Sequence, residues 1–398
     1  MTSDFKQFGL PEALVLTLEG LKITTPTPVQ EATIPVALDG HDILASAQTG
    51  TGKTIAFAVP VIINLIKNPN SMALILAPTR ELAAQVHLRL MQILGKSGHF
   101  TSALLIGGDP MGKQMMQLKR RPQLIVGTPG RINDHLDRGS LKLDKTSILV
   151  IDEADRMLDM GFGIQLDAIA EYLPVKRQTM MFSATVPPTI EKLSRKYLRD
   201  PKRITIGSTT QAVPKIKQEV IHTSGHDKMQ HLLKELEARQ GSIIIFVKTK
   251  RGTERLARDL ERLGHSADAI HGDLHQRRRE KVIEGFRNKK SRIMVATDVA
   301  ARGLDVPHIM HVINYDLPQC PEDYIHRIGR TGRAGAEGSA LCLICPEDVI
   351  RWRSIQRLMN PGEKIERTGM DRRTERGPTG PRKSRFGGRS SFKFGGRR

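Results

Sequence analysis

The stretch "AQTGTGKT" at residues 47–54 places glycines, a lysine and a hydroxyl side chain at the spacing of a phosphate-binding loop. Glycines let the backbone wrap closely around phosphate oxygens, and N–H groups at the start of a following helix point at the anion. Lys53 can reach the β- and γ-phosphates, and the Thr54 hydroxyl can bind Mg²⁺. Ala47 stands where the usual pattern begins with glycine. The predicted ATP-binding loop consists of Ala47, Gln48, Thr49, Gly50, Thr51, Gly52, Lys53 and Thr54.

Three carboxylates follow an apolar run in "ILVIDEADRML", residues 148–158. Side by side in a low-dielectric place they would repel one another, so a positive partner is expected. A strand-end aspartate in a protein with such a loop holds Mg²⁺, which gives Asp152 its partner. Glu153 is then suited to orient the water that attacks the γ-phosphate and to accept its proton. The two segments together predict ATP hydrolysis.

These segments lie in a repeating pattern of apolar runs, each followed by a polar turn and a helical pattern. "DILASA" precedes the loop, "MALILA" precedes "PTRELAAQ", "QLIVG" precedes "TPGR", "ILVI" precedes "DEAD", and "TMMF" precedes "SAT". The pattern begins again with "SIIIFV", "RIMVA" and "HIMHVINY". Such alternation is typical of an α/β fold with doubly wound parallel sheets, whose ligands gather at the carboxyl ends of the strands. We therefore expect two similar domains in tandem.

The boundary between the domains follows from where the pattern stops and begins again, and the last boundary follows from composition. We expect one domain over residues 1–206, a linker over 207–214 and a second domain over 215–360. Residues 361–398 are rich in Gly, Arg and Ser without periodicity, so disorder is expected there. Phenylalanines interleave with the arginines of this tail, which suits either an auxiliary RNA-binding segment or a merely solubilising end.

Charge and composition narrow the class of partner. The 398 residues carry a formal net charge of +20, which attracts polyanions and makes a nucleic acid the leading partner. The start has no secretory signal pattern and no run of 18 apolar residues occurs, so we expect a cytoplasmic protein without a membrane span. Three cysteines are too few for a disulfide framework, and "CLIC" at 342–345 reads as buried strand cysteines. His271 and His326 lack the spacing of metal ligands.

The ordered set of motifs resembles the DEAD-box RNA helicase family over almost all of residues 5–345. The motifs are "PTPVQ" at 26–30, "PTREL" at 78–82, "TPGR" at 128–131, "DEAD" at 152–155, "SAT" at 183–185, "ARGLD" at 301–305 and "HRIGRTGR" at 326–333. The resemblance implies two RecA-like domains that couple ATP hydrolysis to local RNA unwinding or to remodelling of RNA–protein complexes. The basic tail is similar to that of bacterial members, in particular the RhlE-like group.

In the first domain the resemblance assigns a segment for adenine recognition to residues 3–30. Gln30 would read the base edge, with Thr25 nearby and Phe5 stacking on the ring. Lys22 and Ile23 depart from the family, which usually has glycine and an aromatic residue there.

The resemblance also assigns residues that couple the nucleotide to the second domain. Ser183 and Thr185 would hydrogen-bond to the carboxylates of the "DEAD" segment, and Asp305 would approach the ribose. Arg330 and Arg333 would act as arginine fingers, since charge that develops on the phosphoryl oxygens calls for fixed cationic donors. The expected catalytic residues are Lys53, Asp152, Glu153, Arg330 and Arg333, and the expected coupling residues are Asp155, Ser183, Thr185 and His326.

An RNA-binding face is expected at other strand ends. Short hydroxyls, backbone N–H groups and arginines suit contacts to phosphate and sugar, which contain no base code, so binding should be largely independent of sequence. The expected residues are Pro78, Thr79, Arg80, Gly108, Thr128, Pro129, Arg131, Arg279, Thr297 and Arg302.

Two alternatives share these motifs: an ATP-gated RNA clamp with little unwinding, and a DNA-directed motor. For the helicase we expect ATP and Mg²⁺ as cofactors, RNA as the main partner, a monomeric state, and protein partners from ribosome assembly or RNA decay.

Overall fold

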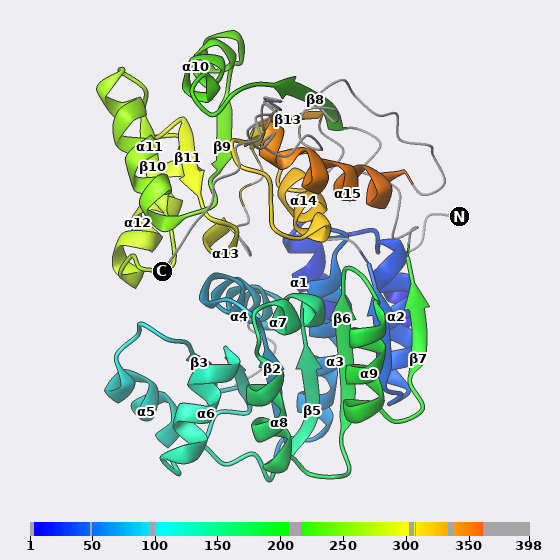
Figure 1. Ribbon diagram of the computed structural model, residues 1–398. Coiled ribbons are helices and arrows are strands. Elements are labelled where there is room, and N and C mark those ends of the chain that lie inside the picture. The colour runs from blue at the N-terminus through cyan, green and yellow to red at the C-terminus, as the bar shows by residue number, and fades with distance from the viewer. Residues whose placement is uncertain are drawn as a thin grey trace, which may run out of the picture.

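The computed structural model describes residues 4–47, 50–95, 100–206, 216–301, 306, 308–332 and 337–360 (Figure 1). They form two lobes, each built on a parallel β-sheet with helices on both faces. The expected linker, residues 207–214, and the expected tail, residues 361–398, lie outside the described residues.

Lobe 1 contains a seven-stranded sheet with the order β3-β4-β2-β5-β6-β1-β7. Its strands are β1 (Ile43–Ser46), β2 (Met72–Leu76), β3 (Ser102–Leu105), β4 (Leu124–Gly127), β5 (Thr146–Ile151), β6 (Gln178–Ser183) and β7 (Lys202–Thr205). Its helices are η1 (Phe5–Phe8), α1 (Glu12–Gly20), α2 (Pro28–Leu38), α3 (Lys53–Lys67), α4 (Arg80–Leu94), α5 (Met111–Lys119), α6 (Pro129–Asp137), α7 (Ala154–Asp159), α8 (Gly163–Glu171) and α9 (Pro188–Tyr197).

Lobe 2 contains a six-stranded sheet with the order β10-β11-β9-β12-β13-β8. Its strands are β8 (Ile216–His222), β9 (Ser242–Phe246), β10 (Ala267–Ile270), β11 (Ile293–Ala296), β12 (Ile309–Asn314) and β13 (Gly338–Ile344). Its helices are α10 (Lys228–Ala238), α11 (Lys250–Arg262), α12 (Gln276–Arg287), α13 (Asp298–Ala301), α14 (Pro321–Ile328), η3 (Pro346–Asp348) and α15 (Val349–Met359). The expected α/β fold with two parallel sheets is confirmed.

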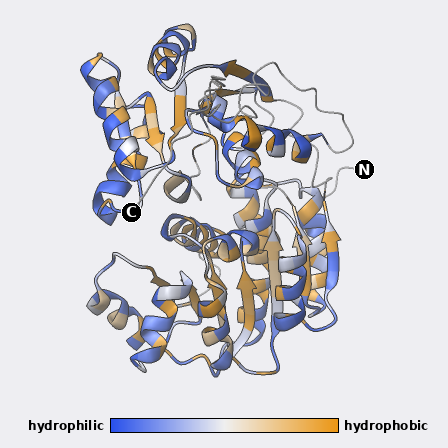
Figure 2. Cartoon of the chain, viewed as in Figure 1, coloured by the Kyte–Doolittle hydropathy of each residue, from blue (hydrophilic) through white to orange (hydrophobic). Residues whose placement is uncertain are grey.

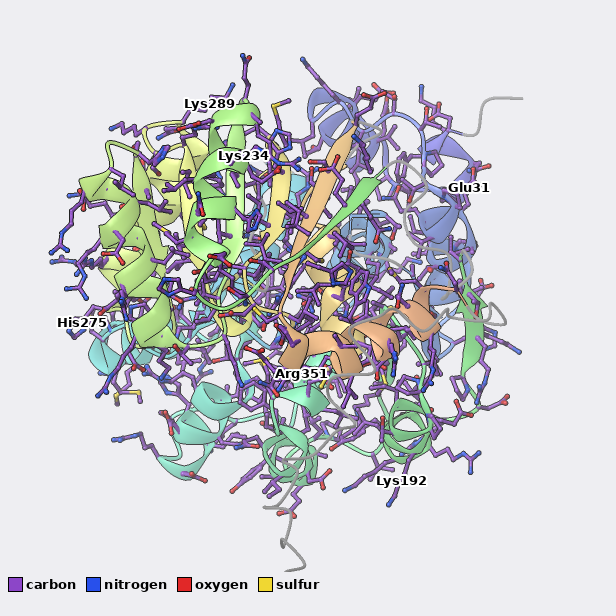
Figure 3. The ribbon with its side chains drawn as sticks, turned by 45° about the horizontal axis from the view of Figure 1, so that its top comes forward. Glu31, Lys192, Lys234, His275, Lys289 and Arg351 are labelled. Atoms are coloured by element: carbon purple, nitrogen blue, oxygen red, sulfur yellow. The ribbon has the colours of Figure 1, made fainter. Side chains whose placement is uncertain are left out.

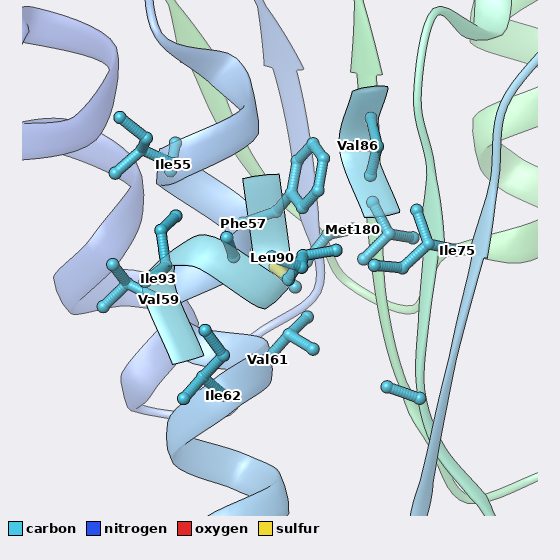
Figure 4. Close-up of a cluster of buried hydrophobic side chains, with 14 of the residues drawn as sticks. Ile55, Phe57, Val59, Val61, Ile62, Ile75, Val86, Leu90, Ile93 and Met180 are labelled. Carbon is cyan, nitrogen blue, oxygen red and sulfur yellow. The ribbon is translucent and has the colours of Figure 1, made fainter. Parts of the chain in front are cut away.

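Each sheet has a hydrophobic cluster on both faces, as a fully parallel sheet requires. The strands are mostly apolar, whereas the helices turn polar residues outward (Figure 2). In lobe 1 the apolar side chains of α3 and α4 pack against β2 and β6 (Figure 4). Phe57 of α3 lies 5.3 Å from Phe182 of β6, centroid to centroid. This packing fixes the start of α3, where the predicted phosphate loop ends.

Charged side chains cover the outside of both lobes, among them Lys192, Lys234 and Lys289 (Figure 3). Cys342 and Cys345 are buried, and the described cysteines are free thiols. Among the described helices, none combines the length and the apolarity that crossing a bilayer requires.

Candidate active site

Three predicted motifs meet because their strands are neighbours in the sheet of lobe 1. The phosphate loop follows β1, the "DEAD" segment follows β5 and the "SAT" segment follows β6, which lies between the other two strands. The Ala47 N–H donates to the Ser183 carbonyl at 3.0 Å, so the first and third motifs are joined directly. All three therefore lie at the carboxyl edge of the sheet, where ligands of this fold class bind.

The phosphate loop needs its glycines for conformation and for space. Gly50 and Gly52 have φ of +87° and +98°, in the left-handed region that favours glycine. A Cβ on Gly52 would lie 2.3 Å from Nε2 of Gln30. Lys53 begins α3, and its buried ammonium group donates to the Ala47 carbonyl at 2.8 Å. The lysine thus lies folded over the loop, while Gln48 and Thr49 are outside the described residues.

Gln30 connects the expected adenine-recognition segment to this loop. Its Oε1 accepts from the Thr27 N–H at 3.0 Å as part of a capping box on α2, and its Nε2 donates to the Gly52 carbonyl at 3.1 Å. Thr25, five residues earlier in the chain, is exposed to solvent. Phe5 is only 1% exposed and packs edge-on against Phe8, so its ring offers no free face on which a base could stack.

Lys22 adopts φ of +61° at the position where the resemblance expects glycine. Lys22 therefore has the left-handed backbone conformation that glycine adopts easily, although it carries a side chain.

Asp152 and Glu153 lie buried side by side after β5. Burial and the adjacent Glu153 carboxylate raise the pKa of Asp152 to about 7. Oδ1 of Asp152 is buried and has no hydrogen-bond partner among the described residues. Glu153 has a left-handed backbone with φ of +53°, and its Oε2 accepts from Nη1 of the buried Arg156 at 2.6 Å. The Glu153 carboxylate is thereby held in one orientation.

The residues present fit a magnesium ion. A dication would supply the partner that Asp152 Oδ1 lacks, and Thr54, in the first turn of α3, carries a second oxygen ligand. Mg²⁺ typically takes one or two protein ligands and completes its shell with phosphates and water. Among the described residues no group of three or more His, Cys, Asp or Glu forms a metal cage.

Replacing Asp152 with asparagine is expected to stabilise the nucleotide-free protein by roughly 0.5 to 2 kcal/mol at pH 8, as relief of a strained active site commonly does. The raised pKa means that folding disfavours the ionised Asp152 carboxylate, so its cost is complete above pH 7 and disappears as the pH falls toward the ordinary value. Thermal unfolding at pH 8 and pH 5 should show a gain that is smaller at pH 5.

Asp155→Asn is the matched control and should destabilise the protein. Oδ2 of Asp155 accepts from the Ala184 N–H, the Thr185 N–H and the Thr185 hydroxyl at 2.9, 3.1 and 3.3 Å. An asparagine would lose part of this set. An equal loss of stability in both variants would contradict the strain assigned to Asp152.

The "SAT" segment contacts the "DEAD" segment through only part of the expected set. Thr185 bonds to Asp155 as expected, but the Ser183 hydroxyl donates to the Thr185 carbonyl at 2.5 Å. A hydroxyl has one proton, so this bond replaces the expected bond from Ser183 to a carboxylate.

Lobe 2 approaches the same edge through α14. Burial works to raise the pKa of Asp155, but His326 of lobe 2, together with Lys53 and Arg156, outweighs it and lowers the pKa. Arg330 is 3% exposed, donates through Nε to the His326 carbonyl at 3.2 Å, and lines a small cavity with Arg156 of lobe 1. Of the two expected arginine fingers, Arg330 lies at the boundary between the lobes, and Arg333 is outside the described residues. Asp305, expected at the ribose, is also outside them.

Arg327 fixes α14, the helix that carries His326 and ends just before Arg330. It forms a bidentate pair with Asp298 at 2.5 and 2.7 Å, donates to Asn314 and to the Asp316 carbonyl, and stacks over Phe246. These contacts hold α14 against α13 and orient Arg330 before any ligand is bound.

The predicted RNA-binding residues gather on the other side of β5. A pocket of about 520 Å³ is lined by residues of both lobes. They include Pro78, Thr79, Arg80, Glu81, Gly107, Gly108, Thr128, Gly130, Arg131, Gly272 and Arg279. Pro129 and Thr297 lie at the starts of α6 and α13 and are not part of this lining, and Arg302 is outside the described residues.

Three arginines and two carboxylates line this pocket: Arg279 pairs with Glu81 and Arg131 pairs with Asp134, so the lining has one more cation than anions. Burial, together with the nearby Arg279 and Arg131, lowers the pKa of Arg80 even though Glu81 opposes the shift. A bound phosphate would offset this repulsion, so the pocket suits an anionic backbone.

Arg279 contacts protein where the resemblance expected RNA. Its Nε and Nη2 donate to Oε1 of Glu81 at 2.7 and 2.6 Å, and its Nη1 donates to the His271 carbonyl at 3.0 Å. The two ionised side chains are each 6% exposed and join lobe 2 to lobe 1 at the edge of the pocket. Arg279 thus positions the lobes in this arrangement, because all of its guanidinium nitrogens already have partners.

Sequence reasoning missed Glu81 and Arg156. Glu81 belongs to the "PTREL" motif, and Arg156 follows "DEAD" three residues after Glu153, a spacing at which helical side chains meet. That spacing was the available signal for Arg156, whereas the partner of Glu81 is 198 residues away.

Fold and site together define a P-loop protein of two tandem RecA-like lobes. A family model described as DEAD/DEAH box helicase matches residues 27–193, and one described as helicase conserved C-terminal domain matches residues 227–335. The chain is 43% identical over 347 residues to the ATP-dependent RNA helicase CshA of Listeria monocytogenes, covering 87% of this chain and 66% of that protein. It is 40% identical over 365 residues to the DEAD-box ATP-dependent RNA helicase CshA of Geobacillus kaustophilus, covering 91% and 78% of the two chains.

A solved structure of Dbp5 from S. cerevisiae, bound to RNA and ADP BeF3, matches with a TM-score of 0.82 and 32% identity, covering 94% of this chain and 97% of that chain. The chain therefore belongs to the DEAD-box helicase family. The RhlE-like grouping rested on the tail and stays a prediction.

Proposed function

We propose that the chain is an ATP-dependent RNA helicase, which hydrolyses ATP to ADP and phosphate and uses the cycle to unwind short RNA duplexes or remodel RNA–protein complexes. One observation carries the proposal: lobe 2 completes both sites of lobe 1. His326 and Arg330 approach the nucleotide side, and Arg279 and Gly272 complete the pocket on the RNA side. Whatever holds the lobes together at one site therefore shapes the other.

The mechanism follows from this shared edge. Lys53 and the loop N–H groups bind the phosphates, and Asp152 with Thr54 would hold Mg²⁺, which neutralises phosphate charge when bound. Glu153, oriented by Arg156, accepts the proton of the attacking water, and Arg330 stabilises the charge that develops on the phosphoryl oxygens. Hydrolysis removes the ligand that both lobes grip, so the lobes separate and RNA is released.

RNA would be held by its backbone in the 520 Å³ pocket. Arg80, Arg131 and the glycine backbone contact phosphate and sugar, so binding does not depend on base sequence. A strand that follows this surface departs from regular duplex geometry, and each lost base-pair step costs about 0.6 to 2.2 kcal/mol if DNA stacking is a guide. Only a few base pairs need to be lost in one cycle.

Displacement of a short labelled RNA strand in the presence of ATP tests the proposal. ATP-dependent retention of RNA without displacement would favour the RNA clamp. ATPase stimulation by single-stranded DNA equal to that by RNA would favour the DNA-directed motor. Monomeric state, cytoplasmic location and partners in ribosome assembly or RNA decay are proposed on the family resemblance.

Lys53→Ala is expected to lower kcat for ATP hydrolysis by about 10²- to 10³-fold, because a fixed cation at the phosphates is lost. The ammonium group of Lys53 lies within 2.8 Å of the loop carbonyl of Ala47, so it is already in place at the loop. Phosphate release at saturating RNA measures the effect. Lys67→Ala, at the exposed far end of the same helix, should retain wild-type turnover.

A further inference from the structure

The buried side of α5 is formed by a polar residue. Of the nine residues of this helix, all of them described, Gln114 alone is buried, at 1% exposure. Met115 and Met116 are instead 39% and 63% exposed. Helices normally bury apolar residues, and a buried amide is costly unless its hydrogen bonds are made. The burial of Gln114 must therefore be explained by its partners.

The Gln114 amide is fully used. Nε2 donates to the carbonyls of Ile106 and Asp109 at 2.9 and 3.3 Å, and these residues are the two ends of the loop 106–109. Oε1 lies 3.2 Å from Nε2 of His135, a side chain of α6 that is 0% exposed. One side chain thus spans the base of the loop while a second holds it in place.

The partners also determine the proton arrangement of His135. Oε1 of Gln114 can only accept, so Nε2 of His135 carries the proton and donates it. The neutral ring then accepts at Nδ1 from the Ser140 hydroxyl at 2.8 Å, and this single proton is not available to the His135 carbonyl, which lies 3.0 Å from the same oxygen. Burial, aided by Arg131, lowers the pKa of His135 and so favours this neutral form. A continuous chain of donors runs from Ser140 through His135 and Gln114 to the loop.

The loop that Gln114 holds forms part of the candidate RNA pocket. Gly107 and Gly108 line it, and a Cβ on Gly108 would lie 2.6 Å from Nη1 of Arg80. The Asp109 carbonyl that accepts from Gln114 also accepts from Nη1 of Arg131 at 3.1 Å. The position of this one carbonyl therefore affects both the backbone beside Arg80 and the orientation of Arg131.

We propose that Gln114, oriented by His135, is a positioning residue for the RNA-contacting face of lobe 1. The inference rests on the proposed function, since it names what the loop is positioned for. Gln114 does not line the pocket and acts through the loop 106–109 and Arg131. Without its two donors the Ile106 carbonyl loses this partner and the Asp109 carbonyl keeps Arg131, so the loop gains alternative conformations. RNA affinity falls, while the phosphate chemistry on the other side of β5 is unaffected.

Gln114→Met tests the inference, because methionine keeps the length of the side chain and removes its donors. In RNA titrations of ATPase activity we expect the RNA concentration for half-maximal rate to rise about tenfold, the effect of losing one or two net hydrogen bonds. The maximal rate at saturating RNA should stay at the wild-type value. Gln114→Glu keeps the acceptor for His135 but loses both donors, so the same rise is expected.

Gln117→Met is the matched control. Gln117 lies one turn further along α5, and its Oε1 accepts from the Leu104 N–H at 3.3 Å, away from the loop. Its half-maximal RNA concentration should remain that of the wild type. An equal rise in this control would show a general effect of loosening α5 and would overturn the assignment to Gln114.

Other outcomes are equally decisive. An unchanged half-maximal RNA concentration in a folded Gln114 variant overturns the inference. So does failure of both Gln114 variants to fold while Gln117→Met folds, because Gln114 would then serve the fold. If RNA does not stimulate the wild-type ATPase at all, the proposed function itself fails, and this is seen before any variant is measured.

Discussion

Replacing Arg330 with alanine is expected to lower kcat for RNA-stimulated ATP hydrolysis by roughly 10³- to 10⁵-fold, the range for an arginine finger. Arg330 is 3% exposed and lies at the boundary with lobe 1, where it shares a cavity with Arg156. Arg327 and Asp298 fix the neighbouring helix α14 in advance, so little reorganisation is needed when charge develops on the phosphoryl oxygens. Phosphate release at saturating ATP and RNA measures the loss.

Arg351→Ala is the control for this prediction. Arg351 is a partly exposed arginine of α15 that pairs with Asp348 at 3.1 Å, so its loss should leave turnover unchanged. A decrease of less than tenfold in Arg330→Ala, with ATP and RNA at saturation, would show that Arg330 does not act in the reaction.

Glu153→Gln is expected to slow hydrolysis by roughly 10²- to 10⁴-fold, the usual contribution of a general base. Glutamine has nearly the same shape and its amide oxygen can still accept from Arg156, but it cannot take up a proton. ATP and RNA should therefore bind as before, and RNA should dissociate slowly because the closed state is not released. Single-turnover hydrolysis and RNA dissociation in ATP are the two measurements.

Glu171→Gln, at the exposed end of α8, should hydrolyse and release at wild-type rates. Rapid RNA release from the Glu153 variant while ATP remains intact would separate hydrolysis from release. The proposed coupling between the two sites would then be wrong.

The interior of the fold was predictable from the sequence, and its edges were not. The quoted apolar runs correspond to β1, β2, β4, β5, β6, β9, β11 and β12, and the strand expected around "CLIC" corresponds to β13. The strands without such a prediction, β3, β7, β8 and β10, are the four sheet edges. A central parallel strand is covered on both faces and reads as a continuous apolar run, whereas β7 (Lys202–Thr205) has three exposed residues out of four. The repeating pattern is correspondingly weak at the edges.

At the candidate site, the motifs predicted which residues lie close together but not which side chains form hydrogen bonds with one another. Asp152, Lys53 and Thr185 lie at one edge because their strands are neighbours, a consequence of topology. The contact of Arg279 with Glu81 depends on how two lobes pack, and no local pattern encodes it. The same holds for Phe5, whose ring is covered by its own core cluster.

The buried pair between Glu81 and Arg279 has a consequence for repeated cycles. Both ions lose water when they meet, and that penalty largely cancels their attraction, so such a pair aligns two bodies with little net adhesion. The pair therefore aligns lobe 1 with lobe 2 but adds little to the free energy that holds them together. A motor that must part its halves after every ATP benefits from this combination, because an apolar seam of equal area would be slow to reopen.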